Sequence, residues 1–251
     1  MVSKDQINIQ VKTCRAIIHL HTRFSYDCQT RPEKIVDLAI KKNIDLICIT
    51  DHDSIEGSVA AKEYAKQKYG DSIIVLIGGE FYSDFGDIIG IGIQETIEGK
   101  DPENIINRIK EQDGLVLLPH PYYAHKNIEW LAEKSDLIEV FNGRVTETLN
   151  QQAADLAQKF HKPTYAASDA HLLQDSFLCR NEFTVNNDTG TDWKSILLSG
   201  DRKFETGYSP KTHLHYSQLV KGWKKRNTRL MFDSGKKMMK TYVKSILKKG
   251  K

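Results

Sequence analysis

Short apolar runs alternate with longer stretches of helical period between residues 16 and 167. The short runs are rich in Ile, Leu and Val, which predicts buried strands at residues 16–20, 45–50, 73–77, 115–118, 137–141 and 163–167. Between them, apolar positions recur at helical spacing, which predicts helices at residues 31–43, 55–69, 102–112 and 147–161. Residues 87–93 could form a hairpin with the third strand.

This alternation predicts a mostly parallel α/β sheet, because nearly continuous apolar strands are typical of sheets covered on both faces. A barrel and a doubly wound open sheet both fit the pattern. The 251 residues suffice for one domain of barrel size, and no repeat or low-complexity linker interrupts them before residue 200.

The net charge of +3 is the sum of two opposite parts. Residues 221–251 carry twelve Lys and Arg side chains against Asp233 alone, which gives +11 and leaves −8 for residues 1–220. Within this basic tail, apolar residues recur at helical spacing between lysines, which predicts an amphipathic helix. Three interpretations stay open: docking on an anionic membrane surface, contact with nucleic acid or an acidic protein, and packing on the domain with a solvated lysine face.

Several features favour a cytoplasmic protein, which the basic tail could attach to a membrane peripherally. No apolar run approaches the roughly 20 residues that a membrane-spanning helix needs. The N-terminal segment Met1–Gln6 is polar, unlike a signal peptide. Cys14, Cys28, Cys48 and Cys179 are far apart and form no CxxC pair, so we expect reduced thiols.

Side chains of the kinds that bind metals follow five of the predicted strands. They are His19, His21, His52, Glu80, His120, Asp169 and His171. Because the carboxyl ends of parallel strands meet on one face of the fold, we expect these side chains to converge. In His19-x-His21 both rings point to the same side of the strand, so they can share one ion. A carboxylate of Asp51 or Asp53 could hold the second ring nitrogen of His52.

The ligand types indicate the metal. Mixed imidazole and carboxylate ligands suit Mn, Fe or Zn ions better than Ca or Mg ions. A single His-x-His is weak support, and we interpret His213-Leu214-His215, in the polar C-terminal region, as incidental. The combination of ligands in this order after successive strands is what predicts a metal site.

At these residues the sequence resembles the PHP family, the polymerase and histidinol phosphatase domain. The residues 19–27, HLHTRFSYD, are similar to its first motif, and residues 49–57, ITDHDSIEG, to its second. Gly78-Gly79-Glu80, Pro119-His120-Pro121, residues 138–144 and Ser168-Asp169-Ala170-His171 resemble the remaining motifs. The resemblance covers about residues 15–185.

The resemblance implies a distorted (β/α)7 barrel, similar to a TIM barrel, that carries two or three divalent transition-metal ions. It would place His19, His21, Glu80 and Asp169 on one ion, Glu80 and His120 on a second, and Asp27, His52 and His171 on a third. The sequence departs from the pattern in two respects. Glu139 and Asn142 stand where many members have a further His, and Cys28 stands where a glycine is common.

The implied activity of residues 1–220 is hydrolysis of a phosphate monoester of a small metabolite or nucleotide. Water held between two cations loses a proton near neutral pH, and the resulting hydroxide would attack phosphorus in line. We expect Asp169 to orient it and His52 or His171 to protonate the leaving group. Arg144 and Arg23 are candidates for binding the phosphate, because a guanidinium matches its geometry.

Two alternatives remain at this point. One is histidinol-phosphate phosphatase, since nothing in the sequence selects the substrate. The other is a non-catalytic module that metal merely stabilises, although the eight expected ligands are all present.

Overall fold

A computed structural model describes residues 12–185, 192–199 and 201–249. The strands are β1 (Lys12–Ile18), β2 (Leu46–Ile49), β3 (Ile74–Ser83), β4 (Gly86–Ile91), β5 (Leu115–Leu118), β6 (Leu137–Asn142), β7 (Thr164–Ala167), β8 (Arg180–Val185) and β9 (Arg202–Glu205). The helices are α1 (Pro32–Lys41), α2 (Glu56–Tyr69), α3 (Pro102–Glu111), α4 (Ile128–Lys134), α5 (Glu147–Lys159), the 3₁₀ turn η1 (Leu173–Asp175), α6 (Trp193–Leu198), α7 (Lys211–Lys224) and α8 (Thr228–Lys249). The segment Met1–Gln6, on which the expectation about a signal peptide rests, lies outside the described residues.

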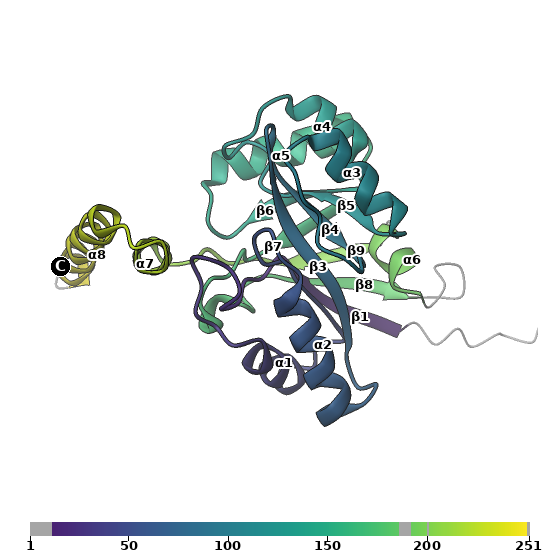
Figure 1. Cartoon of the computed structure of the whole chain (residues 1–251), viewed down its shortest axis with the longest axis horizontal. Helices are drawn as coiled ribbons and strands as arrows, with labels where there is room; N and C mark the ends of the chain where they lie inside the picture. The colour runs from purple at the N-terminus through teal and green to yellow at the C-terminus, as the bar shows by residue number, and fades with distance from the viewer. Residues whose placement is uncertain (1–11, 186–191, 200, 250–251) are drawn as a thin grey trace, which may run out of the picture.

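The strands form one sheet in the order β7-β6-β5-β4-β3-β2-β1-β8-β9, which curls into a nearly closed barrel with helices on its outside (Figure 1). The expected distorted α/β barrel is therefore confirmed. The hairpin expected at residues 87–93 is also present, since β4 runs antiparallel to β3. The expectation of a mostly parallel sheet was wrong, because the pairs β3–β4, β4–β5, β1–β8 and β8–β9 are all antiparallel.

The barrel is closed by a side chain where the backbone ladder stops. The buried amide of Asn181 on β8 accepts a hydrogen bond from Ala166 N at 3.0 Å and donates one to Ala166 O at 2.7 Å. It thereby joins β8 to β7 as a neighbouring strand would. A single parallel bridge between Leu20 and Ala170 completes the closure near the carboxyl ends of β1 and β7.

Alternation along β1 divides the core into an inner and an outer layer. Ala16 and Ile18 point into the barrel, where they join Leu46, Leu117 and Phe183. Outward-facing residues of β1 and β2 pack under α1 and α2 in a second cluster, and a third lies under α3, α4 and α5. This two-sided burial is the reason that the strands are apolar at nearly every position.

Helices α7 and α8 form a hairpin that projects from one end of the barrel (Figure 1). The basic tail expected to begin at residue 221 starts inside α7, and the expected amphipathic helix corresponds to α8. Our sequence analysis did not predict α4, α6 or α7. No helix in the described part of the chain is both long and apolar enough to cross a membrane.

The first turn of α2 packs closely against the buried carboxylate of Asp51. A Cβ atom added to Gly57 would fall 1.8 Å from Asp51 Oδ2, whereas one added to Gly235 in α8 would have no atom within 4 Å. We therefore expect Gly57→Ala to lower the free energy of unfolding by about 1–3 kcal/mol through overpacking. Gly235→Ala should raise it by up to about 1 kcal/mol, because alanine is the better helix former. Chemical denaturation of both variants measures the difference, and equal stabilities would contradict this packing.

Candidate metal centre

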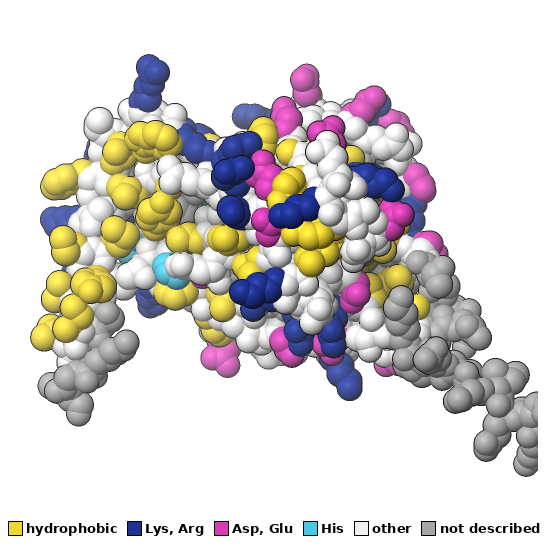
Figure 2. Space-filling model, turned by 90° about the horizontal axis from the view of Figure 1, so that it is seen from below, with side chains coloured by type: hydrophobic (Ala, Val, Ile, Leu, Met, Phe, Trp, Pro, Cys, Tyr) yellow, Lys and Arg dark blue, Asp and Glu magenta, His cyan; other side chains and the backbone are white. Residues whose placement is uncertain are grey.

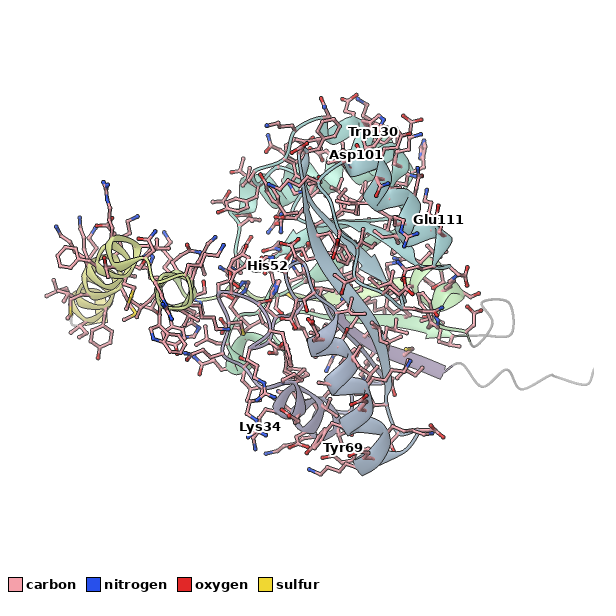
Figure 3. All side chains as sticks on the ribbon, viewed as in Figure 1. Lys34, His52, Tyr69, Asp101, Glu111 and Trp130 are labelled. Atoms are coloured by element: carbon pink, nitrogen blue, oxygen red, sulfur yellow. The ribbon has the colours of Figure 1, made fainter. Side chains whose placement is uncertain are left out.

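The structure brings all eight expected ligands to one mouth of the barrel. They are His19, His21, Asp27, His52, Glu80, His120, Asp169 and His171. Six of them follow a strand, Glu80 lies within β3, and Asp27 lies in the loop after β1. Figure 3 shows His52 at the end of the barrel that faces the α7–α8 hairpin. All are buried except His52, whose side chain is 14% exposed.

Glu80 occupies the centre of the group. Its carboxylate oxygens lie 3.4 Å from His19 Nε2, 3.4 Å from His21 Nε2, 3.1 Å from His52 Nδ1 and 3.2 Å from His120 Nε2. A carboxylate with imidazoles on both of its oxygens is placed to bridge two cations.

The ligand atoms form three overlapping groups, in each of which all atoms lie within 4.8 Å of one another. The groups are His19, Glu80 and His120; His19, His21 and Asp169; and His21, His52 and His171. Asp27 Oδ2 lies 3.1 Å from His171 Nε2 and 3.5 Å from His52 Nε2, beside the third group. The family resemblance implies Asp27, His52 and His171 as ligands of the third ion. In the structure, His21 also lies within reach of this ligand group.

Several of these atoms are buried without a hydrogen-bond partner among the described residues. They are His19 Nε2, His21 Nε2, Asp27 Oδ1 and Glu80 Oε2. A buried polar atom without a partner costs about 1–3 kcal/mol. Divalent cations between the three groups would satisfy these atoms, so the residues present fit the metal ions that the family implies.

Three of the eight residues have a left-handed backbone. The φ angles are 70° at His19, 27° at His120 and 49° at Asp169. Residues with a Cβ atom rarely adopt this region, and each such position costs about 1–3 kcal/mol. Here the barrel holds that conformation at the ends of β1, β5 and β7, where it turns the three side chains toward the centre.

Burial and neighbouring charges set the protonation of the centre. Burial, together with His171 and His52 nearby, lowers the pKa of His21 to about 3. Burial opposes ionisation of Glu80, but His19 and His52 hold the pKa of its carboxyl well below the ordinary value. Despite burial, the neighbouring carboxylates raise the pKa of His19, His52 and His120. Metal ions would displace the protons from these rings, because neutral imidazole and ionised carboxylate are the forms that bind metal ions.

Glu139 and Asn142, which replace a common ligand of the family, support the centre from outside. Glu139 Oε2 lies 3.1 Å from His19 Nδ1 and accepts a hydrogen bond from His120 N at 3.0 Å. Asn142 Nδ2 donates to Glu139 Oε1 at 3.0 Å and lies 3.3 Å from Asp169 Oδ2. A carboxylate on the far nitrogen of a histidine ligand fixes the ring and its tautomer.

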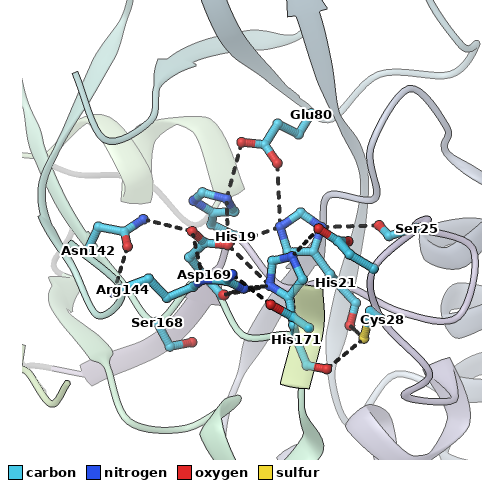
Figure 4. A network of polar contacts seen from close by, with 12 residues as sticks. His19, His21, Ser25, Cys28, Glu80, Asn142, Arg144, Ser168, Asp169 and His171 are labelled. Atoms are coloured by element: carbon cyan, nitrogen blue, oxygen red, sulfur yellow. Dashed lines mark hydrogen bonds and ion pairs between the residues drawn. The ribbon is translucent and has the colours of Figure 1, made fainter. Parts of the chain in front are cut away.

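The loop between β1 and α1 is held by Asp51 and Cys28. Asp51 accepts hydrogen bonds from Thr22 N and from the hydroxyls of Thr22 and Ser25, at 2.5–2.6 Å. The thiol of Cys28 lies 3.2 Å from His21 O and 3.0 Å from His171 O, which links the first and last motifs (Figure 4). The expectation that Asp51 or Asp53 holds His52 was wrong, because the ring nitrogens of His52 face Glu80 and Asp27 instead.

The two candidate phosphate-binding arginines differ in position. Arg144 lies beside the centre, with Nε 3.8 Å from Asp169 Oδ2 and Nη1 in contact with His171 Nδ1 (Figure 4). Arg144 Nη2 donates a hydrogen bond to Ser217 Oγ on α7 at 3.0 Å. Arg23 is 47% exposed and points toward Glu33, and it does not line the cavity over the centre. The structure thus brings Arg144 to the site and leaves Arg23 outside it.

A cavity of about 490 Å³ opens over the centre, and α7 forms one wall of it. This helix contributes Leu214, His215, Gln218 and Lys221 to the wall. Lys221 Nζ lies 4.6 Å from the centre of the Tyr26 ring, which stacks on His52 at 4.5 Å. These residues were missed because His213-Leu214-His215 was interpreted as incidental and Lys221 as part of the basic tail, and no helix was predicted there. The recurrence of Leu214, Gln218 and Lys221 at helical spacing is the signal that could have found the wall.

The fold and the centre together define an α/β barrel with an imidazole–carboxylate cluster able to bind metal ions at its C-terminal mouth. Residues 18–174 match the PHP domain family, and the chain belongs to this family.

Two proteins of Methanocaldococcus jannaschii are similar to this chain in sequence. An uncharacterized protein of Methanocaldococcus jannaschii is 39% identical over 119 residues, which are 43% of this chain and 68% of that protein. A second one from the same organism is 27% identical over 62% of this chain and 65% of its own length, so the chain spans about two thirds of these relatives.

Two solved structures share the fold. One is a two-domain protein of Bacteroides vulgatus whose description includes a "predicted PHP-like metal-dependent phosphoesterase", with a TM-score of 0.66 and 16% identity over 82% of this chain and 69% of that one. The other is PsfC of Pseudomonas syringae, with a TM-score of 0.57 and 13% identity over 86% of this chain and 99% of that one.

Metal binding should stabilise the fold, because ions would satisfy the unpartnered ligand atoms. At an Mn ion concentration 100 times its dissociation constant, the gain is about 2.7 kcal/mol, or roughly 5–10 °C in melting temperature. Chelator should remove this gain and added Mn should restore it. Glu80→Gln should abolish the shift, and Glu63→Gln on the exposed face of α2 should keep it. Thermal melting measures the shift, and a full shift in Glu80→Gln would refute the central role of that carboxylate.

Proposed function

We propose that this chain is a metal-dependent phosphoesterase that hydrolyses a phosphate monoester of a small metabolite or nucleotide. The observation that carries the proposal is the group of unpartnered ligand atoms around Glu80 at the base of a cavity. Ions bound there would lower the pKa of a coordinated water and neutralise charge on phosphoryl oxygens. A cavity of about 490 Å³ is large enough for a small phosphorylated molecule.

The eight ligands would hold two or three ions. His19, Glu80 and His120 fit one ion, His19, His21 and Asp169 a second, and His52 and His171 with Asp27 or His21 a third. Mn, Fe and Zn match this mixture of nitrogen and oxygen ligands.

Asp169 is placed to orient the attacking water. Its Oδ2 faces Asn142 Nδ2 at 3.3 Å and Arg144 Nε at 3.8 Å, while Oδ1 faces His21 at 3.2 Å. These contacts fix the orientation of the carboxylate. Arg144 and Lys221 give one side of the cavity a positive charge that suits a phosphate.

Two histidines that line the cavity could protonate the leaving group. His52 is the more open of the two, because its side chain is 14% exposed and that of His171 is 4% exposed. His52 stacks on Tyr26 at 4.5 Å, which holds the ring in place at the edge of the cavity. We assign the leaving-group proton to His52, on the condition that the third ion does not engage its ring, and keep His171 as the second candidate on the same condition.

His52→Ala should lower kcat for a phosphomonoester by about 10² to 10⁴, because both a ligand and a proton donor are lost. Hydrolysis of p-nitrophenyl phosphate by the Mn-loaded protein provides the measurement. His161→Asn, at an exposed position at the opposite end of the barrel, serves as control and should keep full activity.

Other outcomes separate the alternatives. Equal turnover in wild type and His52→Ala would refute the proposed mechanism. Tight metal binding with no turnover on any phosphomonoester would instead establish a non-catalytic module. A panel of phosphorylated metabolites that includes histidinol phosphate identifies the substrate.

Lys221→Gln should raise KM for an anionic substrate about 5- to 30-fold and leave kcat within about twofold, because a charged hydrogen bond worth roughly 1–2 kcal/mol is removed. Lys225→Gln is the matched control. Lys225 also lies over the Tyr26 ring, at 4.0 Å, but it does not line the cavity. Steady-state kinetics would contradict this role of α7 if both substitutions changed KM equally.

A further inference from the structure

The α7–α8 hairpin is fixed firmly to the mouth of the barrel. Lys224 at the end of α7 donates its three ammonium hydrogens to carbonyl oxygens of the β1–α1 loop, at 2.7 Å to Arg23, 2.6 Å to Ser25 and 2.7 Å to Cys28. All donors of the ammonium group are thereby satisfied. The first turn of α8 crosses α7 closely, because a Cβ atom added to Gly222 would fall 2.8 Å from Met231. The hairpin is therefore a rigid projection of the barrel.

One face of α8 presents large apolar side chains to solvent. Phe232 is 72% exposed, Met239 66%, Val243 46%, Ile246 53% and Leu247 66%. The steps of seven, four and three residues from Phe232 to Met239, Val243 and Ile246 place them in one stripe along the helix. Figure 2 shows hydrophobic side chains gathered on the part of the molecule formed by the hairpin.

Basic side chains run beside this stripe. Lys236, Lys237, Lys240 and Lys244 are exposed on α8, and Asp233 is the one acidic residue of the segment 221–251. Trp223, 57% exposed at the end of α7, adds an aromatic side chain of the kind that is enriched at membrane interfaces. Helix α8 does pack against α7, through a side that includes the buried Ser234, but this packing leaves its apolar stripe facing solvent.

We propose that α8 docks on the surface of an anionic lipid bilayer. The apolar stripe would lie among the acyl chains just below the headgroups, and the lysines would contact anionic headgroups. The helix would lie along the surface, because no described helix is apolar enough to cross the membrane.

The charge of the segment favours a bilayer over other partners. A second copy of this chain would bring another segment of charge +11 against the first, and interface cores between proteins are poor in lysine. Nucleic acid would engage the lysines but leave the aliphatic stripe without a partner. An anionic bilayer satisfies both kinds of side chain at once.

Sedimentation with vesicles tests the proposal. Full-length protein should bind vesicles of phosphatidylcholine with one third phosphatidylserine, and should bind phosphatidylcholine alone at least about 10-fold more weakly. Lys240→Gln/Lys244→Gln should lower the partition coefficient about 25-fold, since each lysine near such a surface contributes roughly a factor of five. Val243→Ser/Ile246→Ser should lower it at least as much.

A matched control distinguishes binding through the α7–α8 hairpin from a general effect of the net charge. Lys34→Gln/Lys62→Gln changes the net charge equally at exposed positions of α1 and α2, and it should bind like wild type. Circular dichroism of all variants verifies that they fold. Absence of binding to the anionic vesicles would overturn the proposal, as would equal losses in control and hairpin variants. A dimer that the Val243→Ser/Ile246→Ser change dissociates, or tighter binding to an oligonucleotide than to vesicles, would overturn it as well.

Discussion

The contact of the Glu80 carboxylate with four imidazole rings is the interaction on which the rest of the site depends. The rings come from three segments, after β1, β2 and β5, so the barrel must hold the ends of these strands within a few ångströms of one carboxylate on β3. Asn181 and the Leu20–Ala170 bridge close the sheet near this end. The closed barrel and the cluster therefore require each other.

Without bound ions, this concentration of polar groups lowers the free energy of unfolding. Left-handed backbone at His19, His120 and Asp169 and unpartnered ligand atoms both oppose folding. Glu139 offsets part of this cost, because it accepts from His120 N and holds His19 from the far side. Strain gathered at the ligands and relieved by a surrounding network is typical of a site selected for function rather than stability.

The barrel and its ligands could be predicted because their signals are local. The place of each ligand after a strand predicts the mouth at which it lies. The strand alternation expected for His19 and His21 does not hold, because β1 ends at Ile18 and His19 has a left-handed backbone. The wall formed by α7 could not be predicted in the same way. Its position depends on Lys224 binding carbonyl groups about 200 residues earlier in the chain and on Ser217 meeting Arg144, and neither contact leaves a local pattern. The antiparallel β8 was missed for a similar reason, since only alternate residues of Arg180–Val185 are buried.

Helix α7 contributes both to the proposed active site and to the hairpin that is proposed to dock on a bilayer. One side of it presents Gln218 and Lys221 to the cavity, and α8 packs against it. Since residues 1–220 carry −8 and residues 221–251 carry +11, an anionic surface would repel the barrel and attract the hairpin. This charge separation would orient the chain with the hairpin toward the surface. The mouth of the barrel lies at the end from which the hairpin projects, so the cavity would face the same side as the bilayer.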